Sequence, residues 1–104
     1  MKADQFAVIY QFNILEDDLE EFISSWENLT ELIYKHEGSL GSRLHKKSNT
    51  EYLAYARWPS RQHWEQSGSN LPPEAKKYSK QMHEACTKIE TLYELDLVSD
   101  LLKD

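Results

Sequence analysis

The segment EYLAYARW at residues 51–58 constrains the fold more than any other part of the sequence. Its aromatic and small apolar residues, with no glycine or proline among them, are typical of a β-strand. Pro59 ends the strand because proline has no N–H group to donate to a sheet ladder, and the hydroxyl of Ser60 can then cap a new helix. The sequence therefore predicts a strand over residues 51–58 followed directly by a helix.

The two faces of this strand are both largely apolar, because side chains alternate between the faces. One face has large residues at its ends and small ones in its middle: Tyr52, Ala54, Ala56 and Trp58. The opposite face carries Leu53, Tyr55 and Arg57. Two alanines between two aromatic rings predict a hollow in the first face, which helices should cover. The second face needs cover as well, and we expect a second copy of the chain to supply it.

The first half of the chain predicts a strand and a long helix. Residues 5–14 are β-branched and aromatic, which is typical of a buried strand. Residues 18–37 carry apolar side chains at three- and four-residue steps, which predicts an amphipathic helix. Asp17 and Glu20 have the spacing of a capping box at its start, and Gly38 is expected just beyond its end.

The second half predicts two further strands and a broken helix. Residues 40–47 should form a hairpin with the strand described above. A helix begins near Ser60, breaks at the paired prolines, and resumes over residues 73–88. Its second piece has an apolar stripe made of Ala75, Tyr78, Met82, Ala85, Cys86 and Ile89. Residues 91–98 alternate between apolar and polar, which predicts a half-buried strand.

These elements give the order β-α-β-β-α-β in a single domain over residues 1–104, with a core over about 5–98 and a short tail over 99–104. The order predicts the α+β class and a ferredoxin-like fold, with an antiparallel four-stranded sheet and both helices on one face. The opposite face is too apolar to stay in water, so we predict a homodimer whose sheets pack face to face.

The composition narrows the choice of partners. A formal net charge of -6 argues against nucleic acid, because binding to phosphates needs a basic surface. The lone Cys86 excludes an internal disulfide and fits a reducing compartment. No apolar run approaches the roughly 20 residues of a membrane helix, and the N-terminal residues lack a signal-peptide core. We therefore expect a cytoplasmic protein with no nucleic-acid or membrane partner.

Three segments resemble the antibiotic biosynthesis monooxygenase (ABM) family: EGSLGSRLH at residues 37–45, YARWPSRQHW at 55–64 and KYSK at 77–80. The resemblance extends over roughly residues 5–98. It implies a dimeric α/β barrel, in which two four-stranded sheets pack together with the helices outside. Members include cofactor-independent oxygenases of polyphenols and quinols as well as haem-degrading enzymes. Resemblance to the oxygenase members implies a reaction that needs no cofactor.

The resemblance also allows a comparison at the site. Oxygenase members carry an Asn four residues before a Trp on the third strand, and a Tyr in the next helix. Trp58 matches that Trp, whereas Trp64 stands where the Tyr is expected. Ala54 stands at the Asn position, where it cannot hydrogen-bond a substrate. The haem-degrading branch needs an Asn near residues 10–11, which are Tyr and Gln here, and only His83 matches its histidine. Haem degradation is therefore not expected.

An oxygenase without metal or flavin needs a dry aromatic cavity and a hydrogen-bonding group or base. The candidate substrate-binding residues are Tyr52, Ala54, Trp58, Trp64, Tyr78 and Trp26. The candidate catalytic residues are His83, as a base, and Trp58, with His63 as an alternative base. Aromatic rings on strands and amphipathic helices ordinarily pack in the hydrophobic core. Each aromatic candidate could therefore be a core residue and have no part in binding. The four histidines lie on different predicted elements, so no metal site is expected.

Two functions follow from these observations. The first is a cofactor-independent monooxygenase that acts on a small aromatic or quinol substrate. The alternative is a non-catalytic homodimer of the same fold that binds a small apolar molecule. The missing Asn and the lack of an evident base favour this alternative.

Overall fold

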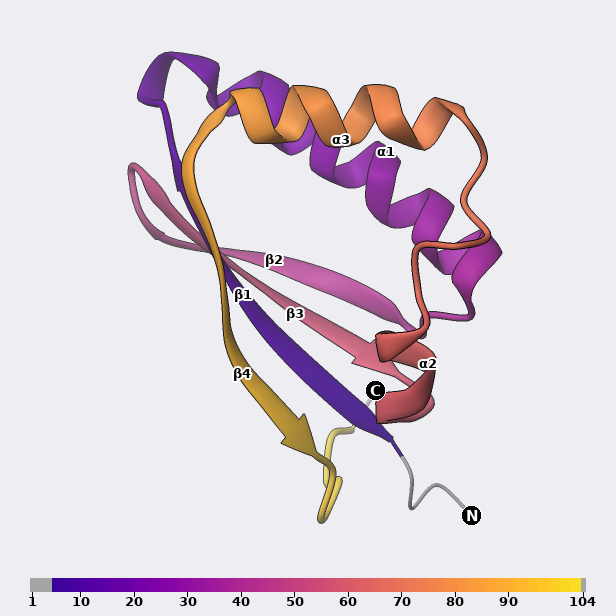
Figure 1. Ribbon diagram of the computed structural model, residues 1–104. Coiled ribbons are helices and arrows are strands. Elements are labelled where there is room, and N and C mark those ends of the chain that lie inside the picture. The colour runs from indigo at the N-terminus through magenta and orange to yellow at the C-terminus, as the bar shows by residue number, and fades with distance from the viewer. Residues whose placement is uncertain (1–4, 104) are drawn as a thin grey trace.

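The computed structural model describes residues 5–103, which form one sheet covered on one face by helices (Figure 1). The elements are β1 (Phe6–Ile14), a 3-10 turn (Glu16–Asp18), α1 (Leu19–Glu37), β2 (Gly41–Ser48), β3 (Glu51–Trp58), α2 (Arg61–Glu65), α3 (Glu74–Glu84) and β4 (Cys86–Asp96). The strands lie in the order β2-β3-β1-β4, and every neighbouring pair is antiparallel. This topology confirms the predicted α+β, ferredoxin-like fold.

Helices α1 and α3 pack against each other above the sheet, and the short α2 lies at one end of it (Figure 1). Phe22 of α1 is fully buried, and its ring centroid lies 5.1 Å from that of Phe12 and 5.9 Å from that of Tyr52. Burial of each such ring contributes about 1.5–3 kcal/mol, so this cluster fastens α1 to β1 and β3. Among residues 5–103, no helix is both long enough and apolar enough to cross a membrane.

Strand β3 has the alternation that the sequence predicts. Its four inward residues are buried, and the residues between them are partly exposed. The inward face therefore lies beneath the helices, while Tyr55 and Arg57 belong to the outer face of the sheet.

The boundary between the last helix and the last strand differs from the prediction. Helix α3 ends at Glu84 and β4 begins at Cys86, so Cys86 and Ile89 belong to a strand and not to a helical stripe. An apolar spacing of three is too short a pattern to distinguish a helix end from a strand start. Residues 87, 89 and 91 are β-branched, and β1 offers pairing partners along nearly its whole length, so the strand prevails.

Two of the three predicted helix-end signals are confirmed. Gly38 follows α1 with a φ of 80°, a left-handed conformation that glycine adopts without strain. The hydroxyl oxygen of Ser60 accepts a hydrogen bond from the backbone N–H of His63 at 3.2 Å. The predicted capping box at Asp17 and Glu20 is wrong, because Asp17 lies inside the 3-10 turn and no side chain caps α1.

A buried carboxylate fastens the connection between α2 and α3. Glu37, the last residue of α1, accepts hydrogen bonds from the backbone N–H groups of Gly68 at 2.6 Å and Asn70 at 3.1 Å. Hydrogen bonds to a charged acceptor are about twice as strong as neutral ones. The connection is therefore held against the end of α1, next to the start of β2.

Candidate active site

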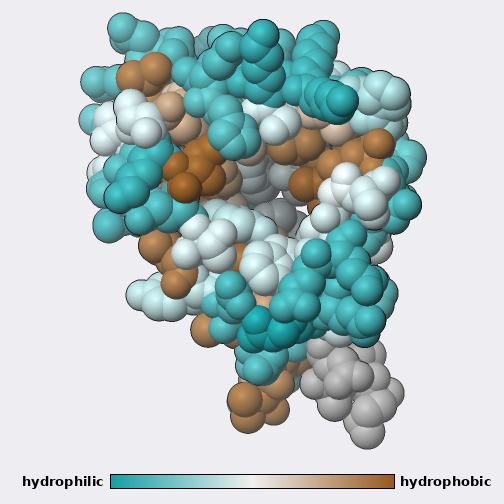
Figure 2. All heavy atoms as spheres, viewed as in Figure 1, coloured by the Kyte–Doolittle hydropathy of each residue, from teal (hydrophilic) through white to brown (hydrophobic). Residues whose placement is uncertain are grey.

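A cavity of about 170 Å³ lies between the inner face of the sheet and the helices. Figure 2 shows apolar side chains flanking a hollow on the side of the molecule that Figure 1 presents. The lining residues come from the four strands, from α1 and α3, and from the segment before β2: Tyr10, Phe12, Trp26, Leu29, Thr30, Ile33, Ser39, Ser42, Ala54, Ala56, Trp58, Met82 and Ile89.

The cavity exists because two small residues interrupt the buried face of β3. Ala54 and Ala56 are 1% and 8% exposed, yet their methyl groups fill little of the space beneath α1. On the neighbouring strand, Tyr10 pairs directly with Ala54, so the ring of Tyr10 lies beside the space that the small alanine side chain leaves. Trp58 adds a second aromatic wall from β3 itself.

Helix α1 provides the opposite wall. Trp26, Leu29, Thr30 and Ile33 line the cavity and follow one another at the three- and four-residue spacing of a single helical face. The periodicity that makes α1 amphipathic therefore also closes the cavity from above.

Trp58 carries a fully buried polar atom that lacks a partner. Its Nε1 is buried and has no hydrogen-bond partner among the described residues. An indole nitrogen can only donate, and a buried donor left unpaired costs about 1–3 kcal/mol. Because Nε1 has almost no accessible surface, an oxygen atom of a bound molecule can accept from it only if the ring or its neighbours shift.

Tyr10 is another aromatic residue of the lining that carries a donor, as does Trp26. Its hydroxyl oxygen accepts a hydrogen bond of 2.8 Å from Nε1 of Trp64. Burial raises the pKa of Tyr10 above its ordinary value of 10.0, and the negative charge of Glu94 adds to this rise, whereas the bond from Trp64 opposes it. Tyr10 therefore remains protonated at neutral pH.

The lining contains no ordinary general base. Its members with polar side-chain atoms are Tyr10, Trp26, Thr30, Ser39, Ser42 and Trp58, and none of the lining residues is His, Asp, Glu, Lys or Arg. Within residues 5–103, no group of three His, Cys, Asp or Glu side chains is arranged to hold a metal ion. The cavity can therefore bind and orient a molecule, but no lining carboxylate or imidazole would take up a proton that leaves it.

The structure brings three of the predicted site residues together at this cavity, namely Trp26, Ala54 and Trp58. Whether they bind a substrate stays a prediction. Trp26 lies on α1 and the other two residues lie on β3, so residues from two distant parts of the sequence line one cavity.

The other predicted site residues lie outside the lining. Tyr52 packs against Phe22 in the core, and the ring of Trp64 lies 5.6 Å from that of Phe6. Tyr78 lies on α3, with Nζ of Lys77 at 5.7 Å from its ring. His83 is exposed on α3, and its Nδ1 lies 2.8 Å from the carbonyl oxygen of Ser79.

His63 is also exposed, and its Nδ1 lies 2.8 Å from the hydroxyl of Ser60. Neither candidate base therefore lines the cavity.

Sequence reasoning did not place Tyr10 at the site. The signal that could have found it is the alternation within residues 5–14, which puts Phe6, Val8, Tyr10 and Phe12 on one face. Tyr10 carries the only hydroxyl in that run. The pairing that sets it opposite Ala54 depends on the register of β1 and β3, which the sequence does not reveal.

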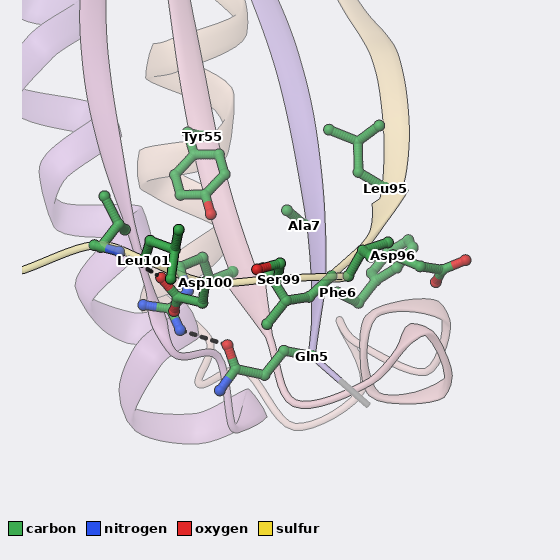
Figure 3. Close-up of a pocket in the computed structure, with 13 residues that line it drawn as sticks. Gln5, Phe6, Ala7, Tyr55, Leu95, Asp96, Ser99, Asp100 and Leu101 are labelled. Carbon is green, nitrogen blue, oxygen red and sulfur yellow. Dashed lines mark hydrogen bonds between the residues drawn. The ribbon is translucent and has the colours of Figure 1, made fainter. Parts of the chain in front are cut away.

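A larger groove, of about 710 Å³, lies on the outer face of the sheet (Figure 3). The C-terminal tail crosses this face from β4 toward β2, and Leu102 reaches the neighbourhood of Arg43. Tyr55 points toward the tail, and Arg57 donates a hydrogen bond to Gln5 (Figure 3). Val98 is 95% exposed, so the tail covers this groove only loosely. The smaller inner cavity lies between packed elements and has mostly apolar walls, so it is the better candidate for chemistry.

Comparison with solved structures identifies the same fold in proteins of distant sequence. SnoaB of Streptomyces nogalater, a cofactor-independent oxygenase, superimposes with a TM-score of 0.75 at 14% identity, covering 97% of this chain and all of SnoaB. A protein of Mycobacterium tuberculosis gives a TM-score of 0.73 at 17% identity, covering 95% of this chain and all of the other. A conserved protein of Methanosarcina mazei gives 0.73 at 15% identity, covering 91% and 94%. These similarities establish the fold alone.

A comparison with curated protein sequences found no match. The family model described as "Antibiotic biosynthesis monooxygenase" matches residues 5–84, which include β1, α1, the β2–β3 hairpin and both later helices. The match spans most of the chain and contains the cavity walls contributed by β1, β3 and α1. The chain belongs to the antibiotic biosynthesis monooxygenase family.

Proposed function

We propose that the protein is a cofactor-independent monooxygenase that oxidises a small phenol or quinol in the inner cavity. The observation that carries the proposal is the aromatic-lined cavity with Trp58 in its wall, because Nε1 of this ring has no hydrogen-bond partner among the described residues. Family membership and the fold shared with SnoaB support the reaction class. The hydrogen bond from Trp58 would hold a substrate oxygen, while the apolar walls keep water from the reacting carbon.

The size of the cavity limits the substrate. A protein cavity of about 150 Å³ with apolar walls holds one benzene molecule. The inner cavity, at about 170 Å³, therefore has room for one substituted ring. Single-ring phenols and quinols fit this volume, and fused polycyclic compounds do not unless the site expands.

The reaction balances without a cofactor. Hydroquinone and O₂ give 2-hydroxy-1,4-benzoquinone and water. One oxygen atom forms the new C–O bond, and the other leaves as water with two hydrogens from the substrate. The four electrons that reduce O₂ all come from the ring. Because no base lines the cavity, the quinol proton leaves to solvent, and the rate should rise with pH as the substrate ionises.

Oxygen consumption with hydroquinone tests the proposal. Replacing Trp58 by phenylalanine removes the N–H donor and keeps an aromatic wall, so kcat/KM should fall about 3- to 10-fold, the worth of one hydrogen bond. Tyr34→Phe is the matched control, since Tyr34 lies on α1 with 59% exposure and does not line the cavity. Oxygen uptake by the wild-type protein no faster than the uptake in buffer would contradict the proposal.

The absence of a base from the lining favours a second candidate, a non-catalytic protein that binds a small aromatic molecule in the same cavity. The two functions are separated by measuring ligand binding and oxygen uptake on the same preparation. A phenol that raises the thermal midpoint with no oxygen consumed supports the binding protein.

We also propose that the protein is a homodimer. The outer face of the sheet exposes Tyr93 and Leu95, and the tail exposes Leu101 and Leu102. Stable interfaces bury about 800 Å² on each partner, and an apolar sheet face closed by a second sheet meets that need. This pairing would also cover the partly exposed Tyr55.

Sedimentation equilibrium should give a mass of twice 12.3 kDa for the wild-type protein. Tyr55→Glu places a charge in the proposed interface and should yield the single-chain mass. Tyr34→Glu, on the solvent side of α1 with 59% exposure, should leave the dimer intact. A wild-type mass of one chain at the highest concentrations studied would show that the outer face is open.

We propose a cytoplasmic, reducing setting as well. The lone Cys86 supports it, because no internal disulfide can form. The net charge of -6 gives no support to a nucleic-acid partner.

A further inference from the structure

The geometry points to Tyr10, held in place by Trp64, as a specificity residue that donates its hydroxyl proton to an oxygen atom of the ligand. The inner cavity would then select aromatic molecules that carry an oxygen acceptor, such as a ring-bound carbonyl, over hydrocarbons of the same shape. This inference rests on the proposed function in one respect, that the inner cavity is a ligand site.

Tyr10 occupies the centre of the inner face of the sheet. It pairs with Ala54 on β3, lines the cavity, and packs against both clusters of the hydrophobic core. Its ring therefore has little freedom to turn away from the volume that Ala54 leaves open.

The hydrogen bond to Trp64 decides which role the Tyr10 hydroxyl can play. An indole N–H has no acceptor capacity, so in the 2.8 Å contact the hydroxyl oxygen of Tyr10 must accept. The hydroxyl proton is thereby left for another acceptor. Within residues 5–103 the hydroxyl of Tyr10 donates no hydrogen bond, so the acceptor has to come from outside the described chain.

Trp64 packs against Phe6, and its helix makes further contacts through Arg61. Its ring lies 5.6 Å from that of Phe6, and the guanidinium of Arg61 stacks 4.5 Å above the same Phe6 ring. Arg61 also forms an ion pair of 2.6 Å with Glu94 on β4. The short helix α2 is thus tied to both β1 and β4, which holds the indole against Tyr10.

The balance of donors and acceptors then defines the ligand. Nε1 of Trp58 and the hydroxyl of Tyr10 donate to no acceptor among the described residues. The indole of Trp26 and the hydroxyls of Thr30 and Ser42 also line the cavity, whereas no carboxylate or imidazole does, so donors outnumber strong acceptors there. The raised pKa of Tyr10 keeps its proton in place at neutral pH. A ligand oxygen with free lone pairs satisfies donors of this kind, whereas a ligand that offers only C–H groups leaves them unpaired.

Acetophenone and ethylbenzene provide a matched pair of probes, because they have nearly the same shape and differ in a carbonyl oxygen. Isothermal titration of each gives the ratio of the ethylbenzene to the acetophenone dissociation constant. In Tyr10→Phe this ratio should fall about 3- to 10-fold relative to the wild-type protein, because one hydrogen bond is lost. Comparing ratios cancels the different hydration of the two probes.

Two further variants complete the experiment. Trp64→Phe keeps the ring against Phe6 but frees the Tyr10 hydroxyl to rotate, and a smaller fall in the ratio is expected. Tyr34→Phe should leave the ratio unchanged, since Tyr34 is exposed on α1 and does not line the cavity. If Tyr10→Phe fails to fold, the ratio in Trp64→Phe decides the question.

The outcomes separate the two proposals. If both probes bind and the ratio is unchanged in the Tyr10 variant, the role of Tyr10 is overturned while the cavity remains a ligand site. If neither probe binds to the wild-type protein, the cavity is not a ligand site and the proposed function fails with it. A lower ratio in Tyr10→Phe with ethylbenzene affinity retained supports the inference, because a general loss of structure would weaken both probes alike.

Discussion

Replacing Phe22 by alanine should lower the free energy of unfolding by about 3–5 kcal/mol, as large-to-small substitutions of fully buried aromatics do. Phe22 has no exposed surface, and its ring contacts Phe12 on β1 and Tyr52 on β3. Alanine would leave a void where these two strands meet α1. Domains of this size are stable by roughly 5–15 kcal/mol in total, so the variant should be close to its folding limit.

Urea denaturation followed by circular dichroism measures this effect. Tyr34→Ala is the matched control, because Tyr34 lies on the same helix with 59% of its surface exposed. That substitution should change the free energy of unfolding by less than about 0.5 kcal/mol. Equal losses in the two variants would mean that α1 is not anchored through Phe22.

Alkylation of Cys86 in the native protein should be about 100-fold slower at pH 8 than in the unfolded chain. Burial raises the pKa of the Cys86 thiol from 9.0 to about 11. Only the thiolate reacts, and a rise of this size reduces the thiolate fraction at pH 8 by roughly two powers of ten. Iodoacetamide labelling followed by mass spectrometry, with and without denaturant, provides the two rates.

The same shift has a consequence for stability. Because the native protein holds this proton more tightly than the unfolded chain, the stabilisation is fully present below pH 9 and declines as the pH rises toward 11. Cys86→Ser should lose this part of the alkaline decline. Native and unfolded rates within a few-fold of each other at pH 8 would show that the start of β4 opens readily.

The fold was predictable wherever the signal is local. The strand over residues 51–58 matches β3 at both ends, because Pro59 terminates it and its alternation reflects burial on one face. Helix α1 was equally evident, since its apolar spacing and Gly38 mark its face and its end. The boundary of β4 was not predictable, because residues 86–89 satisfy a helical spacing as well as a strand. Pairing with β1, a contact between distant segments, decides between the two.

For the candidate site too, only the residues marked by a local pattern were predictable. Ala54 and Trp58 could be placed at a hollow because both lie on one face of one strand. The exposure of His83 could not be predicted from its nearness to Tyr78, since the outward face of α3 becomes known only when the helix packs on α1. The contact between Tyr10 and Trp64 joins residues 54 positions apart, and no periodicity reveals it.

The positions of the tryptophans make the protein its own optical reporter. The sequence has three, of which Trp26 and Trp58 line the cavity and Trp64 bonds to Tyr10 at its edge. Every indole therefore senses the polarity of this one region. A molecule that enters should change the intensity and wavelength of the emitted light without any attached dye, and the remote surfaces of the protein contribute no background.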